Sequence, residues 1–230
     1  MLKIAILILN YKTGPMTDAL STYFTETDTY PNKYKDIYVI NNGVDSSCRT
    51  ANIQLPENLY FTKGFHEGYK AIKNKKKYDG FYFVCSDVGC ESGNDTVKTL
   101  VETLFSDESY GQIHAKCNSP HKVMYKLAPN SINDTVPFIE QVAPMIKTST
   151  LEKIGFWDTD FILGWGPDFD YGYRVRQAGL KNVVTSLCQI SQKGHVSHEN
   201  YSEFSKKARK QMNSLMKKKY GIHWSLKLKI

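Results

Sequence analysis

The chain has 230 residues and a formal net charge of +7, with 41% hydrophobic and 23% charged positions. This length and composition allow one hydrophobic core without disulfides or partner subunits, so we expect a single domain over residues 1–230. The apolar N-terminal run stops at Asn10 and nothing elsewhere approaches the length that crosses a bilayer core of about 30 Å, which excludes a membrane-spanning helix.

The cysteines indicate the redox environment of the protein, and the distribution of charge indicates its classes of binding partner. The five cysteines are odd in number, scattered and without paired metal-ligand spacing, which predicts neither a disulfide framework nor a zinc site. We therefore expect a reducing, cytoplasmic location, with the chain soluble or peripheral on a membrane surface. The positive charge suits nucleic acid, an anionic membrane or an acidic small molecule. The lysine clusters at 70–77 and 206–219 contain no interleaved aromatic residues, so a nucleic-acid partner is not expected.

In chain order, short apolar, β-branched or aromatic runs alternate with segments of helical spacing. The runs that predict strands are 4–9, 37–40, 81–85 and 183–187. The segments that predict helices between them are 16–26, 66–77 and 95–105. The intervals are long enough for crossover helices, so the pattern predicts an α/β fold with a mostly parallel central sheet flanked by helices.

The second half of the chain adds a loop and three helices. Residues 118–142 are rich in Pro, Asn and Ser, and we expect a long loop with short strands lying over a site. Short helices are expected at 148–155 and 168–178. Over 200–230 we expect a basic amphipathic helix, at 201–220, followed by a tail. Its apolar face either docks on the domain or attaches to a membrane surface, and Trp224, Leu226 and Leu228 favour attachment.

Ligands of a parallel α/β sheet bind beyond the carboxyl ends of its strands, so the residues after each run are candidates for a site. Asn10 and Tyr11 follow the first run and offer a hydrogen-bonding group and an aromatic face for a base. Asn41 follows the second run, before Gly43. Taken alone, a residue such as Tyr11 is more often just a strand-end aromatic, and a plain loop explains Asn41 equally well.

Carboxylates follow the later runs. Asp87, after Ser86, can hold a hard divalent cation that bridges two phosphates, although a turn aspartate is an equal alternative. Asp168 follows Trp165 and precedes a predicted helix, where it can act as a general base, while Asp170 caps or orients; a capping role for both stays open. A histidine after the fourth run, His195 or His198, can complete the metal site.

Taken in order, these motifs resemble glycosyltransferase family 2, especially its rhamnosyltransferase-like members, over roughly residues 3–202. The first pieces are 6–11 (Ile-Leu-Ile-Leu-Asn-Tyr), 38–43 (Tyr-Val-Ile-Asn-Asn-Gly), 63–68 (Lys-Gly-Phe-His-Glu-Gly) and 84–88 (Val-Cys-Ser-Asp-Val). The strongest piece is 151–158 (Leu-Glu-Lys-Ile-Gly-Phe-Trp-Asp), followed by 168–174 (Asp-Phe-Asp-Tyr-Gly-Tyr-Arg). Single pieces are weak, but five in the same order are specific.

The resemblance implies a GT-A nucleotide-sugar-binding fold and a metal-dependent, inverting hexosyl- or pentosyltransferase. The first candidate for the donor would be a UDP-sugar, with GDP- or dTDP-sugars as alternatives. The acceptor would be a glycan hydroxyl. Mn²⁺ or Mg²⁺ would be the cofactor, bound by Asp87 and His198, and Asp168 would be the catalytic base. The residues that this implies for the donor site are Asn10, Tyr11, Asn41, Gly64, Ser86, Asp87 and Trp165.

Four departures from the family pattern keep an alternative open, and one of them is that Phe65 and His66 shorten the family's glycine-asparagine pattern. Asn41 replaces the usual aspartate, Cys85 replaces the first acidic or amide residue of the metal motif, and Pro167 replaces a glutamate before the base. These changes fit a divergent enzyme or a module that binds a nucleotide sugar without transferring it. A nucleotidyltransferase is disfavoured because residues 10–14 are not the glycine-rich loop that such enzymes place after the first strand.

Overall fold

The computed structural model describes residues 1–44, 46–91, 93, 95–118, 121, 124, 126–194 and 200–229. The strands are β1 (Ile4–Asn10), β2 (Lys35–Asn42), β3 (Ile53–Leu55), β4 (Gly80–Cys85), β5 (Val88–Cys90), β6 (Tyr110–Lys116), β7 (Ile132–Val136), β8 (Met145–Lys147) and β9 (Lys181–Gln192). The helices are α1 (Gly14–Thr22), α2 (Tyr60–Ile72), α3 (Thr96–Leu104), α5 (Thr148–Ile154), α6 (Pro167–Gln177), α7 (Tyr201–Tyr220) and α8 (Trp224–Leu228). A π-turn, Tyr23–Thr27, extends α1, and a 3-10 turn, Asn32–Tyr34, precedes β2.

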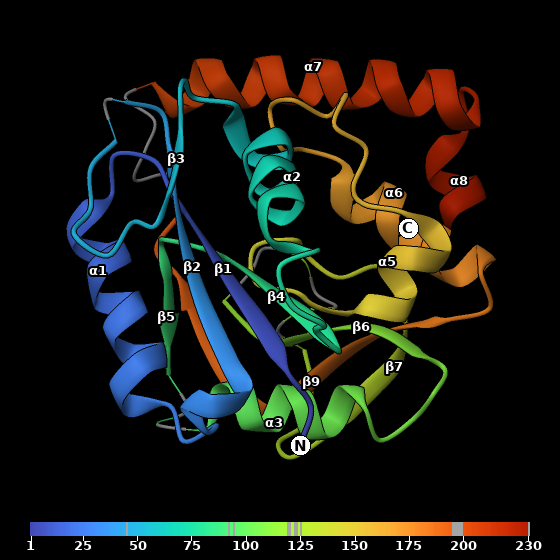
Figure 1. Ribbon diagram of the computed structural model, residues 1–230. Coiled ribbons are helices and arrows are strands. Elements are labelled where there is room, and N and C mark those ends of the chain that lie inside the picture. Colours follow the sequence, from blue (N-terminus) through green and yellow to red (C-terminus); the bar gives the residue numbers. More distant parts are fainter. Residues whose placement is uncertain are drawn as a thin grey trace.

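The strands form one mixed sheet in the order β3-β2-β1-β4-β8-β6-β9-β5, with β7 also paired to β9 (Figure 1). The longest strands pair in parallel, as β1 with β2 and β4, and β6 with β9. Each antiparallel pair involves one of the short strands β5, β7 and β8. The α/β architecture expected from the sequence is therefore confirmed.

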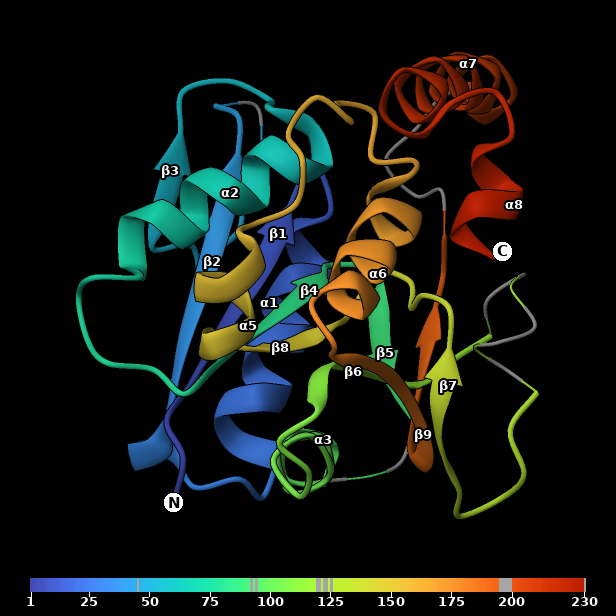
Figure 2. The same ribbon diagram turned by 90° about the vertical axis from the view of Figure 1, so that its right-hand side faces the viewer.

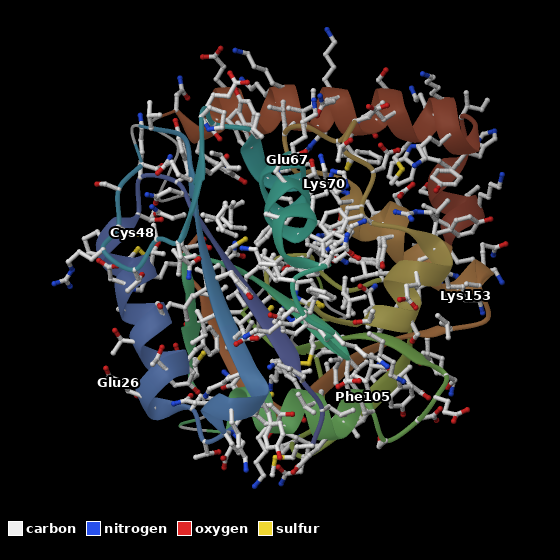
Figure 3. All side chains as sticks on the ribbon, viewed as in Figure 1. Glu26, Cys48, Glu67, Lys70, Phe105 and Lys153 are labelled. Atoms are coloured by element: carbon white, nitrogen blue, oxygen red, sulfur yellow. The ribbon has the colours of Figure 1, made fainter. Side chains whose placement is uncertain are left out.

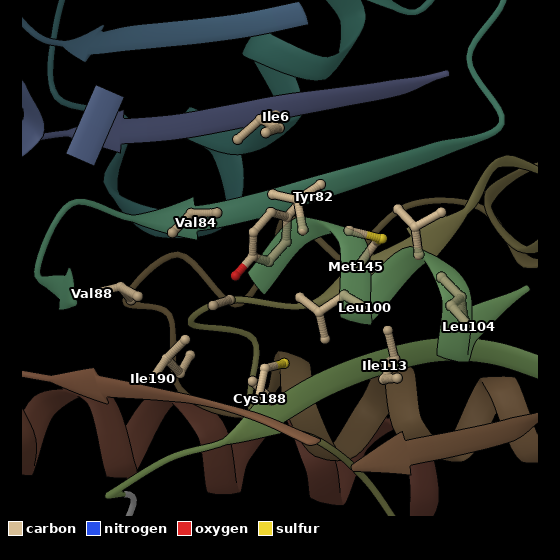
Figure 4. Close-up of a cluster of buried hydrophobic side chains, with 14 of the residues drawn as sticks. Ile6, Tyr82, Val84, Val88, Leu100, Leu104, Ile113, Met145, Cys188 and Ile190 are labelled. Carbon is tan, nitrogen blue, oxygen red and sulfur yellow. The ribbon is translucent and has the colours of Figure 1, made fainter. Parts of the chain in front are cut away.

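The centre of the sheet is covered on both faces, which explains why β1 is a continuous apolar run. Every residue of β1 is buried, and alternate side chains point to opposite faces. Ile4, Ile6 and Ile8 join a core with α1 and α3, part of which is shown in Figure 4. Ala5, Leu7 and Leu9 join a second core with α2, α5 and α6. Burial of both faces fixes the register of this strand.

Several strands differ from the expectation. β3, β5, β6 and β8 were not predicted, and β6 is the longest of them. Its sequence places Gln112 and His114 between apolar residues, which breaks the apolar run. Both side chains are fully buried, and Gln112 Nε2 donates to Asn182 Oδ1 at 2.8 Å across the sheet. Tertiary hydrogen bonding thus explains the buried Gln112. Nδ1 of His114 lies 2.6 Å from the carbonyl oxygen of Ala115, and its Nε2 has no hydrogen-bond partner within the described part of the chain.

Helix α2 begins at Tyr60 and ends at Ile72, rather than spanning 66–77 as expected. Asn42 holds its first turn: the Asn42 side chain accepts a hydrogen bond from Leu59 N at 2.9 Å and donates to Tyr60 O at 3.0 Å. The lysine-rich stretch after Ile72 has no apolar residue before Tyr78. It therefore has no apolar face to pack on the sheet, and the helix does not continue through it.

The apolar face of α7 docks on the domain, as one of the two interpretations expected. Ala208 and Met216 are fully buried, and Met216 forms a third core cluster with Phe161 and Leu228. Leu228 belongs to α8, which the sequence did not predict. Within the residues that the structure describes, no helix is long and apolar enough to span a membrane.

A buried ionic cluster also joins α7 to α6. Asp170 has no exposed surface, forms an ion pair with Lys219 at 2.5 Å and accepts a hydrogen bond from Tyr220 Oη at 2.6 Å. Arg174 Nε donates to the other oxygen of Asp170 at 2.9 Å. Lys219 also pairs with Asp158 at 2.6 Å. Asp170 therefore links α6 to the C-terminal helix α7.

Candidate active site

A cleft of about 880 Å³ opens beyond the carboxyl ends of β1 and β4. Five of the residues singled out from the sequence line it together: Tyr11, Ser86, Asp87, Trp165 and Asp168. They come from the turn after β1, the turn after β4 and the start of α6. The topology therefore gathers side chains that are up to 157 positions apart in the sequence, as expected at this edge of a parallel sheet.

Asn10 lies beneath the cleft in a buried hydrogen-bond network and does not line it. Its Nδ2 donates to Asn41 Oδ1 at 2.8 Å, and its Oδ1 accepts from Thr13 Oγ1 at 3.0 Å and from Thr17 Oγ1 at 2.9 Å. Thr13 Oγ1 in turn lies 2.6 Å from Ser86 Oγ. The network therefore fixes the turn after β1 against the turn after β4.

Asn41 is buried, and both ends of its amide have protein partners. Its Nδ2 donates to Gln54 Oε1 at 3.1 Å, while its Oδ1 accepts from Asn10 and lies 3.5 Å from Sγ of Cys48. Cys48 sits in the loop near α1 in Figure 3. Asn42, which the sequence did not single out, lines the cleft in place of Asn41.

Gly64 also lies behind the cleft wall, within α2. A Cβ at this position would come within 3.0 Å of Leu9 Cδ1 and 3.1 Å of Asn42 Nδ2. The glycine therefore lets α2 pack closely on β1 and β2. Its structural role is to set the position of the wall to which Leu9 and Asn42 belong.

Asp87 is nearly buried and is tied to the end of β9. Its Oδ2 accepts hydrogen bonds from Gly194 N at 3.1 Å and from Gln192 Nε2 at 3.3 Å, and its carbonyl accepts from Lys193 N at 3.0 Å. The chain that continues from Gly194 holds the two histidines considered as metal ligands. His195 and His198 lie outside the described residues.

The potential metal ligands around Asp87 suit a cation that is also coordinated by phosphate oxygens of a substrate. Among the side chains that the structure describes, no group of three or more His, Cys, Asp or Glu residues could hold a metal. Cys85 lines the cleft, but burial raises the pKa of its thiol well above the ordinary value, which disfavours a thiolate ligand. Because Mg²⁺ is commonly held by one or two carboxylates plus substrate phosphates, the single carboxylate of Asp87 fits such a site.

Asp168 stands in the first turn of α6 with its side chain at the cleft wall. Burial and then the negative charge of Glu140 raise the pKa of Asp168 to about 7, against backbone N–H groups that lower it. A carboxyl group with this pKa can both give up and take a proton near neutral pH. The position of Asp168 and its pKa are compatible with the general base predicted from the sequence, and that role stays a prediction.

Glu140 is the main residue of the cleft that the sequence did not single out. It lies in the 118–142 loop, is 8% exposed, and its Oε1 lies 3.6 Å from Nε2 of His121, which also lines the cleft. The only sequence signal was the length of this loop, which we expected to lie over a site. Nothing local in the sequence pairs Glu140 with Asp168.

The raised pKa of Asp168 predicts a pH-dependent effect on stability. The folded chain keeps this proton up to pH about 7, whereas the unfolded chain releases it near 3.8, so raising the pH through this window lowers the free energy of unfolding. Asp168→Asn should therefore melt at a higher temperature than the wild type at pH 8 and at a similar temperature at pH 4. Thermal melts of both proteins at the two pH values measure this; an equal difference at both would contradict the raised pKa.

Trp165 forms an aromatic part of the cleft between two glycines with positive φ. Gly164 has φ 78° and Gly166 has φ 102°, and a Cβ on either would come within 2.9 Å of Phe61 or 2.8 Å of Phe161. Helix α7 closes this side, where the guanidinium of Arg209 lies 5.8 Å from a ring centroid of Trp165. The other α7 residues that line the cleft are Tyr201, Phe204 and Met212.

The fold is shared with solved glycosyltransferases. The chain superimposes on GalNAc-T7 with UDP, GalNAc and Mn²⁺ with a TM-score of 0.64, covering 84% of this chain and 44% of that protein. It superimposes on the mannosyltransferase PcManGT of Pyrobaculum calidifontis in complex with GDP-Man and Mn²⁺ with a TM-score of 0.68, covering 99% and 70%. For TarS of S. aureus the TM-score is 0.65, with 94% and 40% covered.

The sequence identity is 12% in each case, so these similarities concern the fold alone. The chain has the GT-A glycosyltransferase fold. It spans less than half of the length of GalNAc-T7 and of TarS. No family model matches the sequence, and no curated protein is similar to it in sequence. The narrower resemblance to family 2 and its rhamnosyltransferase-like members stays a prediction.

Proposed function

We propose that this protein is a metal-dependent glycosyltransferase that moves a hexose or pentose from a nucleotide sugar to a hydroxyl of a glycan acceptor, with inversion. The observation that carries the proposal is the convergence of Asp87 and Asp168 on one cleft of a GT-A fold. One carboxylate there suits a divalent cation, and the other has a pKa of about 7.

The donor half of the cleft is formed by the turns after β1 and β4. The ring of Tyr11 offers a stacking surface for a base, and the buried pair of Asn10 and Asn41 positions that turn. Ser86 is held against the same turn through Thr13 and precedes Asp87 on the side suited to a diphosphate. A UDP-sugar is the first donor to test, with GDP- and dTDP-sugars next, in keeping with the UDP and GDP-Man bound by the structural neighbours.

Mn²⁺ or Mg²⁺ would be held by Asp87, with His198 as the further ligand, and would neutralise the negative charge on the leaving diphosphate. Asp168 would act at the acceptor, where its carboxylate takes the hydroxyl proton as the oxygen forms a bond to the anomeric carbon. The bond from that carbon to the diphosphate breaks as the new bond forms. A direct displacement of this kind inverts the configuration.

Binding of a nucleotide sugar should raise the melting temperature, and more so with Mn²⁺. A ligand at 100 times its Kd adds about 2.7 kcal/mol, which is about 5–10 °C for a chain of this size. Thermal melts with UDP-, GDP- and dTDP-sugars, with and without Mn²⁺, measure the shift. We expect Asp87→Asn to lose the increment due to metal.

The matched control is Asp160→Asn, since Asp160 is an exposed carboxylate outside the cleft. It should keep the full metal-dependent shift. The absence of a shift with every donor, in either condition, would contradict the proposed function. A shift of equal size with and without Mn²⁺ would show that donor binding does not depend on a metal.

A further inference from the structure

The positive charge of this protein is concentrated in one helix. Helix α7 carries seven Lys and Arg side chains and one acidic residue, Glu203. It therefore accounts for six of the seven net positive charges, and the rest of the chain is close to neutral. A charge distribution of this kind points to an anionic partner for this helix rather than for the protein as a whole.

Four of the seven cations of α7 face solvent, because the apolar side of the helix is docked on the domain. The helix runs along one edge of the molecule in Figure 1, and Figure 2 shows it end-on at an outer corner. Lys206, Lys210, Lys217 and Lys218 are exposed. Across the described part of the chain, none of these four is within ion-pair distance of a carboxylate. Their positive charge is therefore presented to solvent.

The spacing of these lysines matches an extended surface. Residues 206, 210 and 217 recur on one side of the helix, and at 1.5 Å per residue they span about 17 Å. The face is convex, so a small anion cannot contact all of these ammonium groups at once. A flat anionic surface can.

Two exposed aliphatic side chains follow α7 in the chain. Ile222 and Leu226 are each 75% exposed, and Lys227 and Lys229 follow them in the sequence. A soluble polyanion does not bury such aliphatic side chains, whereas the acyl region of a bilayer removes them from water. Together with the lysines they favour a lipid partner over a nucleic acid.

We propose that the outer face of α7, together with Ile222 and Leu226, binds an anionic lipid surface. The same helix lines the cleft through Phe204 and Arg209, so binding holds the cleft beside the lipid headgroups. Resting on the proposed function, this makes the acceptor a glycan hydroxyl presented at a membrane surface. The lipid contact itself needs no donor and no catalysis.

Vesicle sedimentation tests the lipid contact. We expect the protein to sediment with vesicles of equal parts phosphatidylcholine and phosphatidylglycerol, not with phosphatidylcholine alone, and to be released at high salt. Neutralising four lysines in K206Q/K210Q/K217Q/K218Q should weaken binding by about 100-fold or more. The pair I222S/L226S, which leaves the charge unchanged, should weaken it as well. Far-ultraviolet circular dichroism checks that each variant is folded.

The matched control removes the same charge elsewhere. The variant K33Q/K73Q/K77Q/K98Q changes four exposed lysines outside α7 and should bind vesicles like the wild type. Equal weakening by both lysine variants would overturn the proposal, because the effect would then follow net charge. Binding to a short DNA duplex as tight as to the vesicles, and indifferent to I222S/L226S, would overturn it in favour of a nucleic acid. Because no donor is present, neither result depends on the proposed transfer.

Discussion

Replacing Asp168 by Asn is expected to lower sugar transfer by about 100- to 10,000-fold while leaving donor binding intact. The amide keeps the shape of the side chain but cannot accept the acceptor proton. Product formation is measured with the donor identified by thermal shift, and donor affinity is measured in parallel. Asp160→Asn serves as the control for an exposed carboxylate and should retain full activity.

The pH profile separates a base from a merely structural carboxylate. Because the pKa of Asp168 is about 7, transfer should fall as the pH decreases through 7, where the group becomes protonated. Glu140→Gln removes the neighbouring negative charge and should move this acidic limb to lower pH. Wild-type yield from Asp168→Asn, or an acidic limb that Glu140→Gln leaves in place, would contradict the assignment.

Replacing Asp170 by Asn is expected to give the largest loss of stability. The change leaves Arg174 and Lys219 without their shared counter-ion at a position with no exposed surface. Breaking a buried pair costs about 3–5 kcal/mol, and since the two cations are 25% and 28% exposed we expect about 2–4 kcal/mol here. Thermal or urea unfolding should show this, as a fall in melting temperature of about 4–16 °C.

The control for this loss of stability is an exposed ion pair on α7. Glu203 and Lys207 lie 2.6 Å apart with side chains 59% and 68% exposed, so Glu203→Gln should leave the melting temperature nearly unchanged. Similar melting temperatures for Asp170→Asn and the wild type would show that the cluster does not hold α7 to α6.

Much of the fold follows from local patterns in the sequence. The apolar runs of β1 and β4 are continuous because both faces of these strands are buried, and a continuous run is visible without any knowledge of partners. Helices α3, α6 and α7 were placed to within one residue because their apolar spacing and their ends are local features. Asp87 and Asp168 were singled out for a related reason, since each follows a predicted strand or precedes a predicted helix.

Other parts of the site depend on pairs of residues that the sequence keeps far apart. Asn10 and Asn41 were expected at the ligand, but the structure joins them to each other across 31 positions and places Asn42 at the cleft. The neighbouring charges of Glu140 and Asp168 come from a loop and a helix that meet only after folding. The spacing of apolar residues along the sequence does not indicate such a pairing.

The sequence by itself determined the α/β class, the candidate carboxylates Asp87 and Asp168 and the basic amphipathic character of α7, because each depends on residues that are close along the chain. Only the tertiary structure decided that α7 docks its apolar face, closes one side of the cleft and presents its lysines outward. It also decided that β6 is a strand despite the buried Gln112, since Asn182, 70 positions from Gln112, supplies a hydrogen-bond partner. Burial and hydrogen bonding between distant segments set these features, and local propensity does not encode them.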